Sequence, residues 1–204
     1  HLVEARRLRT RVDGDREGEH FVRSRGFQLT SVDQVSELDL SHWEPVSAEP
    51  ESGDYRLVSL AESLGPVERL FARCRSGGVE LPSDLVEWKW DELEHPNLSR
   101  EGSFAVLDGE EPAALGFLTV DLERRVAYNI LTATFPAYRR RGLALLVKLA
   151  SIRWAAENGI ERVLTENDAE NASVLALNKR LGYRRLYDQG TWALERVRVP
   201  SERG

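Results

Sequence analysis

Sulfur-containing residues are almost absent from this chain, which has a single cysteine, Cys74, and no methionine among its 204 residues. One cysteine cannot form an intrachain disulfide, so a fold held together by disulfides is excluded. No group of cysteine and histidine residues has the spacing of metal ligands, and we therefore expect no bound metal. A reducing, cytoplasmic setting is the default expectation for such a chain.

Long apolar segments and excess positive charge are also lacking. No apolar run approaches the roughly 20 residues that span a bilayer, and the N-terminus has no apolar core of a signal peptide. The net charge is −6, which argues against general binding to nucleic acid or to anionic membranes. We expect a soluble, globular protein with neither of these partners. Because the chain has no methionine, and His1 stands where methionine is usual, we also expect that the sequence is either a fragment or lacks some residues of the natural chain.

Residues 127–155 form the most informative stretch of the chain. Residues 127–135 are rich in β-branched and aromatic side chains and predict a strand, which Pro136 ends. Beyond it apolar residues recur at helical spacing, and Asn158 with Gly159 supplies a helix stop. The periodic residues are Leu143, Leu146, Val147, Ala150 and Trp154. The pattern indicates a strand that leads into a helix.

The turn between this strand and this helix contains Arg139, Arg140, Arg141 and Gly142. The first N–H groups of a helix lack partners within the helix and face the turn that precedes it. The helix dipole and three guanidinium groups favour negative charge there, and glycine lets a ligand approach the backbone. The turn is thus a candidate diphosphate site. A solvated basic turn in an ordinary strand–helix unit is the alternative.

The motif Pro136-x-Tyr138-Arg139-x-x-Gly142-x-Ala144, followed by Asn171 and by Leu181-Gly182-Tyr183, resembles the acetyl-CoA signature of the GNAT superfamily of N-acetyltransferases. The resemblance covers about 55 residues in the family's order and spacing. It implies acetyl-CoA as co-substrate. The residues that it assigns to the pyrophosphate are Arg139, Arg140, Arg141, Gly142, Leu143 and Ala144, and those that it assigns to the pantetheine arm are Thr132, Ala133 and Thr134 through their backbone.

Three residues are candidates for the chemistry itself. Glu166, at the end of a predicted strand, is the first candidate for general base, because partial burial there would suit a base; a solvated turn residue or a helix cap is its alternative. Tyr128 is the second candidate. Asn178 stands where many family members have a tyrosine that acts as acid, and an amide can donate a hydrogen bond to sulfur without releasing a proton. Asn178 and Asn171 are also expected at the cofactor arm, with Asn171 alternatively a helix N-cap.

The rest of the chain predicts an α/β fold with a mixed sheet flanked by helices, in the element order of a GNAT domain. Residues 6–13 and 23–27 resemble residues 161–168 and 179–183, which suggests a duplicated unit. We therefore expect residues 1–42 to be the C-terminal part of a first, incomplete GNAT-like domain, residues 43–54 a linker, and residues 55–204 a complete GNAT domain. Further elements are expected as helices at 66–75, 81–93 and 172–181, a hairpin at 103–120, and strands at 55–60, 162–166, 183–187 and 191–199.

These features lead to one functional hypothesis and one alternative. The hypothesis is an N-acetyltransferase in which the amine of a small-molecule acceptor attacks acetyl-CoA directly, with a homodimer as one option for its assembly. The alternative is a catalytically silent GNAT-like module that binds CoA or serves as a structural or interaction partner.

Overall fold

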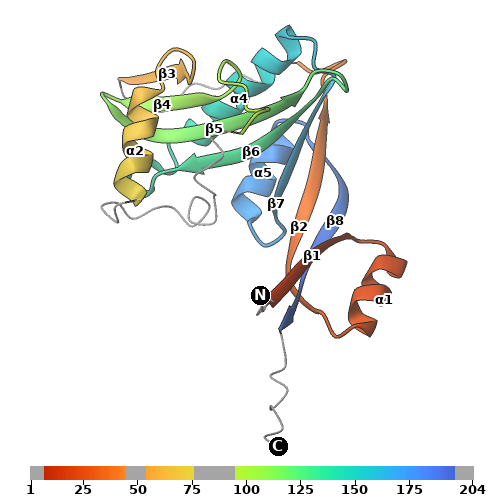
Figure 1. Cartoon of the computed structure of the whole chain (residues 1–204). Coiled ribbons are helices and arrows are strands. Elements are labelled where there is room, and N and C mark those ends of the chain that lie inside the picture. The colour runs from red at the N-terminus through yellow and green to blue at the C-terminus, as the bar shows by residue number, and fades with distance from the viewer. Residues whose placement is uncertain (1–6, 45–53, 76–94, 196–204) are drawn as a thin grey trace, which may run out of the picture. The chain divides into compact units, whose positions relative to one another are not determined.

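A computed structural model describes residues 7–44, 54–75 and 95–195 of the chain (Figure 1). The expected helix at 81–93 and most of the expected linker lie outside the described residues. The elements are β1 (Arg7–Asp13), α1 (Arg16–Ser24), β2 (Gln28–Asp39), β3 (Tyr55–Ser59), α2 (Gly65–Arg75), β4 (Phe104–Asp108), β5 (Glu111–Asp121), β6 (Val126–Thr134), η2 (Pro136–Tyr138), α4 (Leu143–Glu157), β7 (Arg162–Asp168), α5 (Ala172–Arg180) and β8 (Arg184–Glu195).

The strands are hydrogen-bonded in the order β1-β8-β2-β7-β6-β5-β4-β3. Strands β3 to β6 pair antiparallel in succession, as β1 and β8 do, whereas β6 and β7 pair in parallel across the helix that connects them. The sheet is therefore mixed and confirms the predicted α/β class. The chain divides into two compact units, of which unit 1 comprises residues 1–36, 166–176 and 185–204, and unit 2 comprises residues 37–165 and 177–184.

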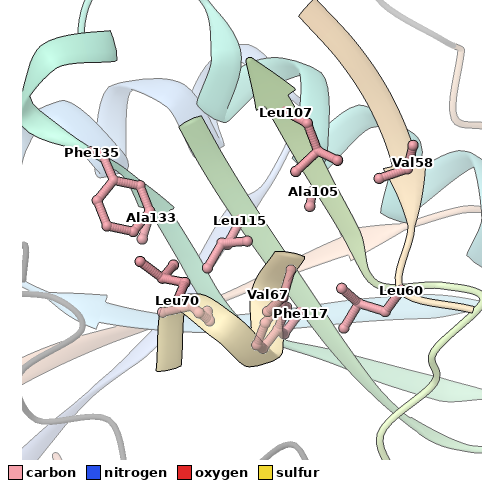
Figure 2. Packing of buried hydrophobic residues seen from close by; sticks show 11 residues of the cluster. Val58, Leu60, Val67, Leu70, Ala105, Leu107, Leu115, Phe117, Ala133 and Phe135 are labelled. Carbon is pink, nitrogen blue, oxygen red and sulfur yellow. The ribbon is translucent and has the colours of Figure 1, made fainter. Parts of the chain in front are cut away.

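In unit 2, one face of the sheet is covered by α2. Val67 and Leu70 of this helix pack on Leu115 and Phe117 of β5 and on neighbouring strand residues, as Figure 2 shows. The central strand β5 is buried on both faces, so its sequence reads as an almost continuous apolar run rather than as an alternating one. Full burial of a side chain such as Phe117 contributes on the order of 2–3 kcal/mol.

Helix α4 packs on β4, β5 and β6 in unit 2. Its residues Leu143 and Val147 contact Ala113 and Ala114 of β5, and the helix comes so close that a Cβ on Gly116 would lie 3.1 Å from Val147. The buried surface of α4 is wider than the predicted apolar stripe, because the helix packs into a second cluster as well. The buried residues of α4 are Leu143, Leu145, Val147, Lys148, Leu149, Ser151, Ile152 and Ala155.

The chain contains two strand–helix–strand segments with elements of equal length. β1, α1 and β2 have 7, 9 and 12 residues, and β7, α5 and β8 also have 7, 9 and 12. Each helix begins with a side-chain cap: Asp15 accepts from the N–H of Gly18 at 2.6 Å, and Asn171 accepts from the N–H of Val174 at 3.3 Å. The N-cap alternative for Asn171 is thus confirmed.

The C-terminal strands differ from the prediction. Instead of two strands at 183–187 and 191–199 there is one continuous strand, β8, as far as Glu195. Gly190 lies inside it for a packing reason, since a Cβ there would meet Trp192 Nε1 at 2.6 Å and Leu29 Cδ1 at 3.0 Å. A glycine that makes room for a tryptophan has the same appearance in the sequence as a glycine that makes a turn.

Candidate active site

The parallel pairing of β6 with β7 ends at Asn129 and Thr165, and β6 continues for five more residues as far as Thr134. At this point the register of β6 with β5 shifts by one residue, so that Ile130 is an extra residue on β6. Asn129, buried at the shift, donates from Nδ2 to the carbonyl of Phe117 at 3.3 Å and accepts from Thr132 Oγ1 at 2.8 Å. These bonds hold the bulge that separates the paired half of β6 from the rest.

The direction of the backbone groups in the second half of β6 follows from its pairing with β5. The N–H of Phe135 donates to the carbonyl of Ala113 at 3.0 Å, and antiparallel partners exchange hydrogen bonds at every second residue. Ala133, opposite Leu115, therefore directs its backbone groups toward β5. Thr132 and Thr134 direct theirs away from β5, toward the side on which the registered pairing with β7 has ended.

The turn after β6 exposes the N-terminus of α4. Arg140 and Gly142 both have left-handed backbone, with φ of 63° and 77°, and α4 begins at Leu143. No side chain caps this end of α4, and the N–H of Leu146 donates to the carbonyl of Gly142 at 3.1 Å. The amides of Leu143, Ala144 and Leu145 precede that bond, and a Cβ on Gly142 would meet no atom within 4 Å. Both features fit the approach of an anion.

The three arginines of the turn are all exposed but have different surroundings. Arg141 donates to the hydroxyl of Tyr55 and, at 3.1 Å, to the carbonyl of Ala137, and its guanidinium lies 5.7 Å from the ring centre of Tyr138. Arg139 donates from Nε to the carbonyl of Thr134 at 3.3 Å. Within the part of the chain that the structure describes, the guanidinium of Arg140 forms no hydrogen bond or ion pair with the protein. Arg140 is thus the side chain most available to an anion.

Two tyrosines that the sequence reasoning did not assign to the site support Arg141. The rings of Tyr55 and Tyr138 meet edge to face with 6.3 Å between their centres. The hydroxyl of Tyr138 donates to Asp108 Oδ2 at 3.1 Å. Burial, and then this hydrogen bond to a carboxylate, raise the pKa of Tyr138, which therefore stays neutral at physiological pH. The turn is built on residues of β3 and β4 as well as on its own.

A buried polar pair lies deeper in unit 2. Lys148 of α4 is 1% exposed and donates from Nζ to Oδ1 of Asn178, itself 2% exposed, at 2.7 Å. The same Nζ lies 5.1 Å from the ring centre of Tyr183. Burial lowers the pKa of Lys148 to about 7 and raises that of Tyr183. Sequence reasoning found Asn178 but missed Lys148, because its position in α4 was read from apolar residues alone.

The remaining predicted residues lie elsewhere. Tyr128 is 43% exposed and lies on β6 five residues before Ala133, on the order of 17 Å away along the strand. Glu166 and Asn171 belong to unit 1. Glu166 is exposed, in contrast to the partial burial expected of it, and forms an ion pair with Arg11. To act as a base, this carboxylate would first have to leave that pair.

Comparison with known proteins adds to this geometry. The model of the acetyltransferase (GNAT) family matches residues 66–183, which is more than half of the chain. The chain belongs to the GNAT family. This family consists of acetyltransferases with a fold that generally binds acetyl-CoA. Comparison with curated proteins found no match.

Solved structures show the same fold at low sequence identity. A GNAT-type N-acetyltransferase from Sphaerobacter thermophilus has a TM-score of 0.70 at 13% identity, over 93% of this chain and 59% of its own. A tandem GNAT protein from the clavulanic acid biosynthesis pathway has a TM-score of 0.66 at 16% identity, over 93% of this chain and 64% of its own. A GNAT protein from Kribbella flavida has a TM-score of 0.59 at 16% identity, over 91% of this chain and 67% of its own. The chain thus spans about three fifths of the first two structures.

No helix among the described residues is both long enough and apolar enough to cross a bilayer. Among the same residues, no cluster of three or more histidine, cysteine, aspartate or glutamate side chains has the arrangement of a metal site.

Proposed function

We propose that this GNAT chain is an N-acetyltransferase that transfers the acetyl group of acetyl-CoA to the amine of a small-molecule acceptor in the cytoplasm. The uncapped N-terminus of α4 carries the proposal, since its first amides follow an arginine turn and have open space at Gly142. A helix end of this kind binds phosphate through backbone N–H groups and the helix dipole. The net charge of −6 suits a cationic amine as the second substrate.

In this proposal the diphosphate of acetyl-CoA lies against the turn. The amides of Leu143 and Ala144 donate to it, and Arg140 and Arg139 add charge, with Gly142 permitting close approach. Arg141 acts mainly by holding the turn, because its guanidinium is bonded to Tyr55 and Ala137. The pantetheine arm then runs along the second half of β6, where the backbone groups of Thr132 and Thr134 face away from β5. Ala133 lies between these two threonines, and its own backbone groups are directed toward β5. Asn171 is the N-cap of α5 and is assigned to the pantetheine arm only by resemblance.

The transfer itself is a substitution at the thioester carbonyl. The neutral amine nitrogen attacks the carbonyl carbon, the C–N bond forms, the C–S bond breaks, and the electron pair of that bond leaves on sulfur. The proton lost by the amine balances the proton that the thiolate gains, so the products are an amide and free CoA thiol. Much of the rate can come from holding the two substrates together.

Three side chains remain candidates for helping this reaction. Asn178 would donate a hydrogen bond to the sulfur, which stabilises the developing thiolate without proton transfer. Glu166 would serve as base once released from Arg11. Tyr128 would reach only an acceptor that extends far along β6.

The second candidate function is a silent module that binds CoA without transferring its acetyl group. The ion pair of Glu166 with Arg11 favours this alternative, because it occupies the first candidate base. Titration calorimetry with CoA tests binding, and release of free thiol from acetyl-CoA with a panel of amines tests transfer. Binding without thiol release would support the silent module. Absence of binding would overturn both candidates.

We further propose that residues 1–42 are the C-terminal part of a first GNAT-like domain, that residues 43–54 link it to the second, and that residues 55–204 form the second. The equal element lengths and the two side-chain caps described above support this division. Light scattering of the purified chain would test for the homodimer that such domains could form.

A further inference from the structure

The two strand–helix–strand segments agree in their contacts as well as in the lengths of their elements. A Cβ on Gly26, after α1, would lie 3.6 Å from Leu194, and a Cβ on Gly182, after α5, would lie 3.3 Å from Leu38. The two leucines occupy the same place in β8 and in β2. The correspondence of β1 with β7, α1 with α5 and β2 with β8 is therefore structural, and residues at equal places can be compared.

This comparison shows that the first segment exposes apolar side chains where the second segment buries them. Leu8 of β1 is 52% exposed, whereas its counterpart in β7, Val163, is fully buried. Phe21 of α1 is 53% exposed, whereas its counterpart in α5, Leu177, is partly buried against a hydrophobic cluster. The first segment thus keeps the apolar positions, but no described residues cover them to the same extent.

The second segment shows what the cover of these positions consists of. The cluster that takes up Val163 and Leu177 contains Ala127 of β6 and also Leu145 and Leu149 of α4. Strand β6 pairs in parallel with β7, and α4 follows β6 in the chain. A parallel strand and the apolar helix after it therefore cover the second segment.

The backbone of β1 has an edge like the one at which β7 meets β6. Strand β1 stands at the end of the sheet order, and among the described residues only β8 pairs with it. The N–H of Gly14 donates to the carbonyl of Asp188 at 2.7 Å, so the backbone groups of Thr10 also point toward β8. Those of Arg9 and Arg11 point toward the other edge, which no described strand occupies.

Thr10 marks the same edge with a side chain. Its counterpart Thr165 is 3% exposed and donates from Oγ1 to the carbonyl of Asn129 on β6, at 3.2 Å. Thr10 is only half-buried, and among the described residues its hydroxyl has no hydrogen-bond partner. A threonine that bonds the neighbouring strand in the second segment is thus also present in the first.

We propose that β1, together with the exposed side chains of Leu8 and Phe21, is the docking surface for a strand and an apolar helix that belong to the first GNAT-like domain and precede β1 in the chain. The strand pairs in parallel with β1, and the helix covers the two side chains. This inference rests on the proposed division into domains and adds to it the surface and the form of its occupant. A second copy of this chain does not fit, because its own β6 and α4 already cover Val163 and Leu177.

Hydrogen exchange followed by NMR tests the 204-residue chain as it stands. The amides of Arg9 and Arg11 should exchange at least about tenfold faster than that of Thr10, which is bonded to β8. Leu8→Lys should change the melting temperature by no more than about 2 °C. The matched control is Leu122→Lys, whose leucine is 70% exposed in the turn between β5 and β6. Slow exchange at Arg9 and Arg11, or a clear loss of stability in Leu8→Lys alone, would overturn the inference, because this chain would then cover β1 itself.

The same measurements are then made on a chain extended upstream by the encoded residues that would complete a domain, about 100. In the extended chain the amides of Arg9 and Arg11 should exchange at least about 100-fold more slowly than in the 204-residue chain. Leu8→Lys should now lower the melting temperature by at least about 5 °C, because it buries a charge. Leu122→Lys should again behave as the wild type. Unchanged exchange in the extended chain would overturn the inference.

Two further outcomes would also overturn it. If light scattering shows a dimer of the 204-residue chain that Leu8→Lys splits, the occupant is a second copy. If the upstream coding sequence has no strand-and-helix pattern like that of residues 126–157, both this inference and the proposed domain division fail. An upstream pattern of that kind with β1 still uncovered would leave the division standing and reject only the docking. These measurements need no acetyl-CoA, so their result is distinct from a failure of the proposed acetyl transfer.

Discussion

Arg141 donates a hydrogen bond to the hydroxyl of Tyr55, which lies 86 residues earlier in the chain. This contact ties the turn before α4 to β3, the strand at the end of the sheet order. It also separates the arginines of the turn by role. Arg141 is hydrogen-bonded to the protein, whereas the guanidinium of Arg140 forms no hydrogen bond or ion pair among the described residues.

We expect Arg140→Ala to weaken CoA binding by about tenfold, since a charge-assisted hydrogen bond to phosphate is lost, and to leave the melting temperature unchanged. Arg141→Ala should instead destabilise the fold by about 1 kcal/mol, because its hydrogen bonds to Tyr55 and Ala137 are lost. Calorimetric titration and thermal unfolding measure the two effects. Arg153→Ala, an exposed arginine on the body of α4, is the control for charge. Equal affinities for Arg140→Ala and Arg153→Ala would contradict this assignment.

Gly142 and Gly159 form a matched pair for the next prediction. Both have left-handed backbone, with φ of 77° and 76°, and a Cβ at either would meet no atom within 4 Å. Alanine at either position should therefore cost about 1 kcal/mol of stability through backbone strain alone. Only Gly142→Ala should also reduce CoA affinity, because the added methyl group lies at the proposed diphosphate site. If both variants bound CoA as the wild type does, the diphosphate would not lie at Gly142.

The strand–turn–helix around Gly142 could be predicted from the sequence because its determinants are local. The alternation in β6, Pro136 in the first turn after it, and the left-handed glycines at 142 and 159 all lie within one segment. The mixed sheet followed from the alternation of helices and strands, which requires a parallel pair, and β6 with β7 supplies it.

The side chains that complete the site could not be predicted in this way. Tyr55 reaches Arg141 from another strand, and Lys148 meets Asn178 across 30 residues of chain. In periodicity a lysine counts as polar, although a long aliphatic stem lets it enter a core when its end finds a partner. The ion pair of Glu166 likewise involves a residue that is distant in the chain, Arg11.

The bulge in β6 gives a prediction for stability. Asn129→Ala removes the hydrogen bonds to the carbonyl of Phe117 and from the hydroxyl of Thr132, both in buried or half-buried surroundings. We expect a loss of about 1–3 kcal/mol in the free energy of unfolding, measured with urea. Thr132→Val removes only one of these bonds at nearly constant shape and should cost less. Equal unfolding midpoints for wild type and Asn129→Ala would show that Asn129 does not hold the bulge.

The last prediction concerns the pH dependence of stability and follows from Lys148. Its pKa is about 7 in the folded protein, against 10.5 for an ordinary lysine. Between these values the unfolded chain binds a proton that the folded chain does not, so the free energy of unfolding rises with pH in this window. The slope that this one group contributes is at most about 1.4 kcal/mol per pH unit. Below pH 7 both states carry the proton, and the contribution is constant.

Urea unfolding at pH 6, 7, 8 and 9 would measure this effect as the difference between the wild type and Lys148→Met. The difference should be constant from pH 6 to 7 and should then move in favour of the wild type by up to a few kcal/mol by pH 9. Lys179→Met should follow the wild type at each pH, because its lysine is exposed. Parallel curves for wild type and Lys148→Met would mean that Lys148 keeps its proton in the folded protein across this pH range.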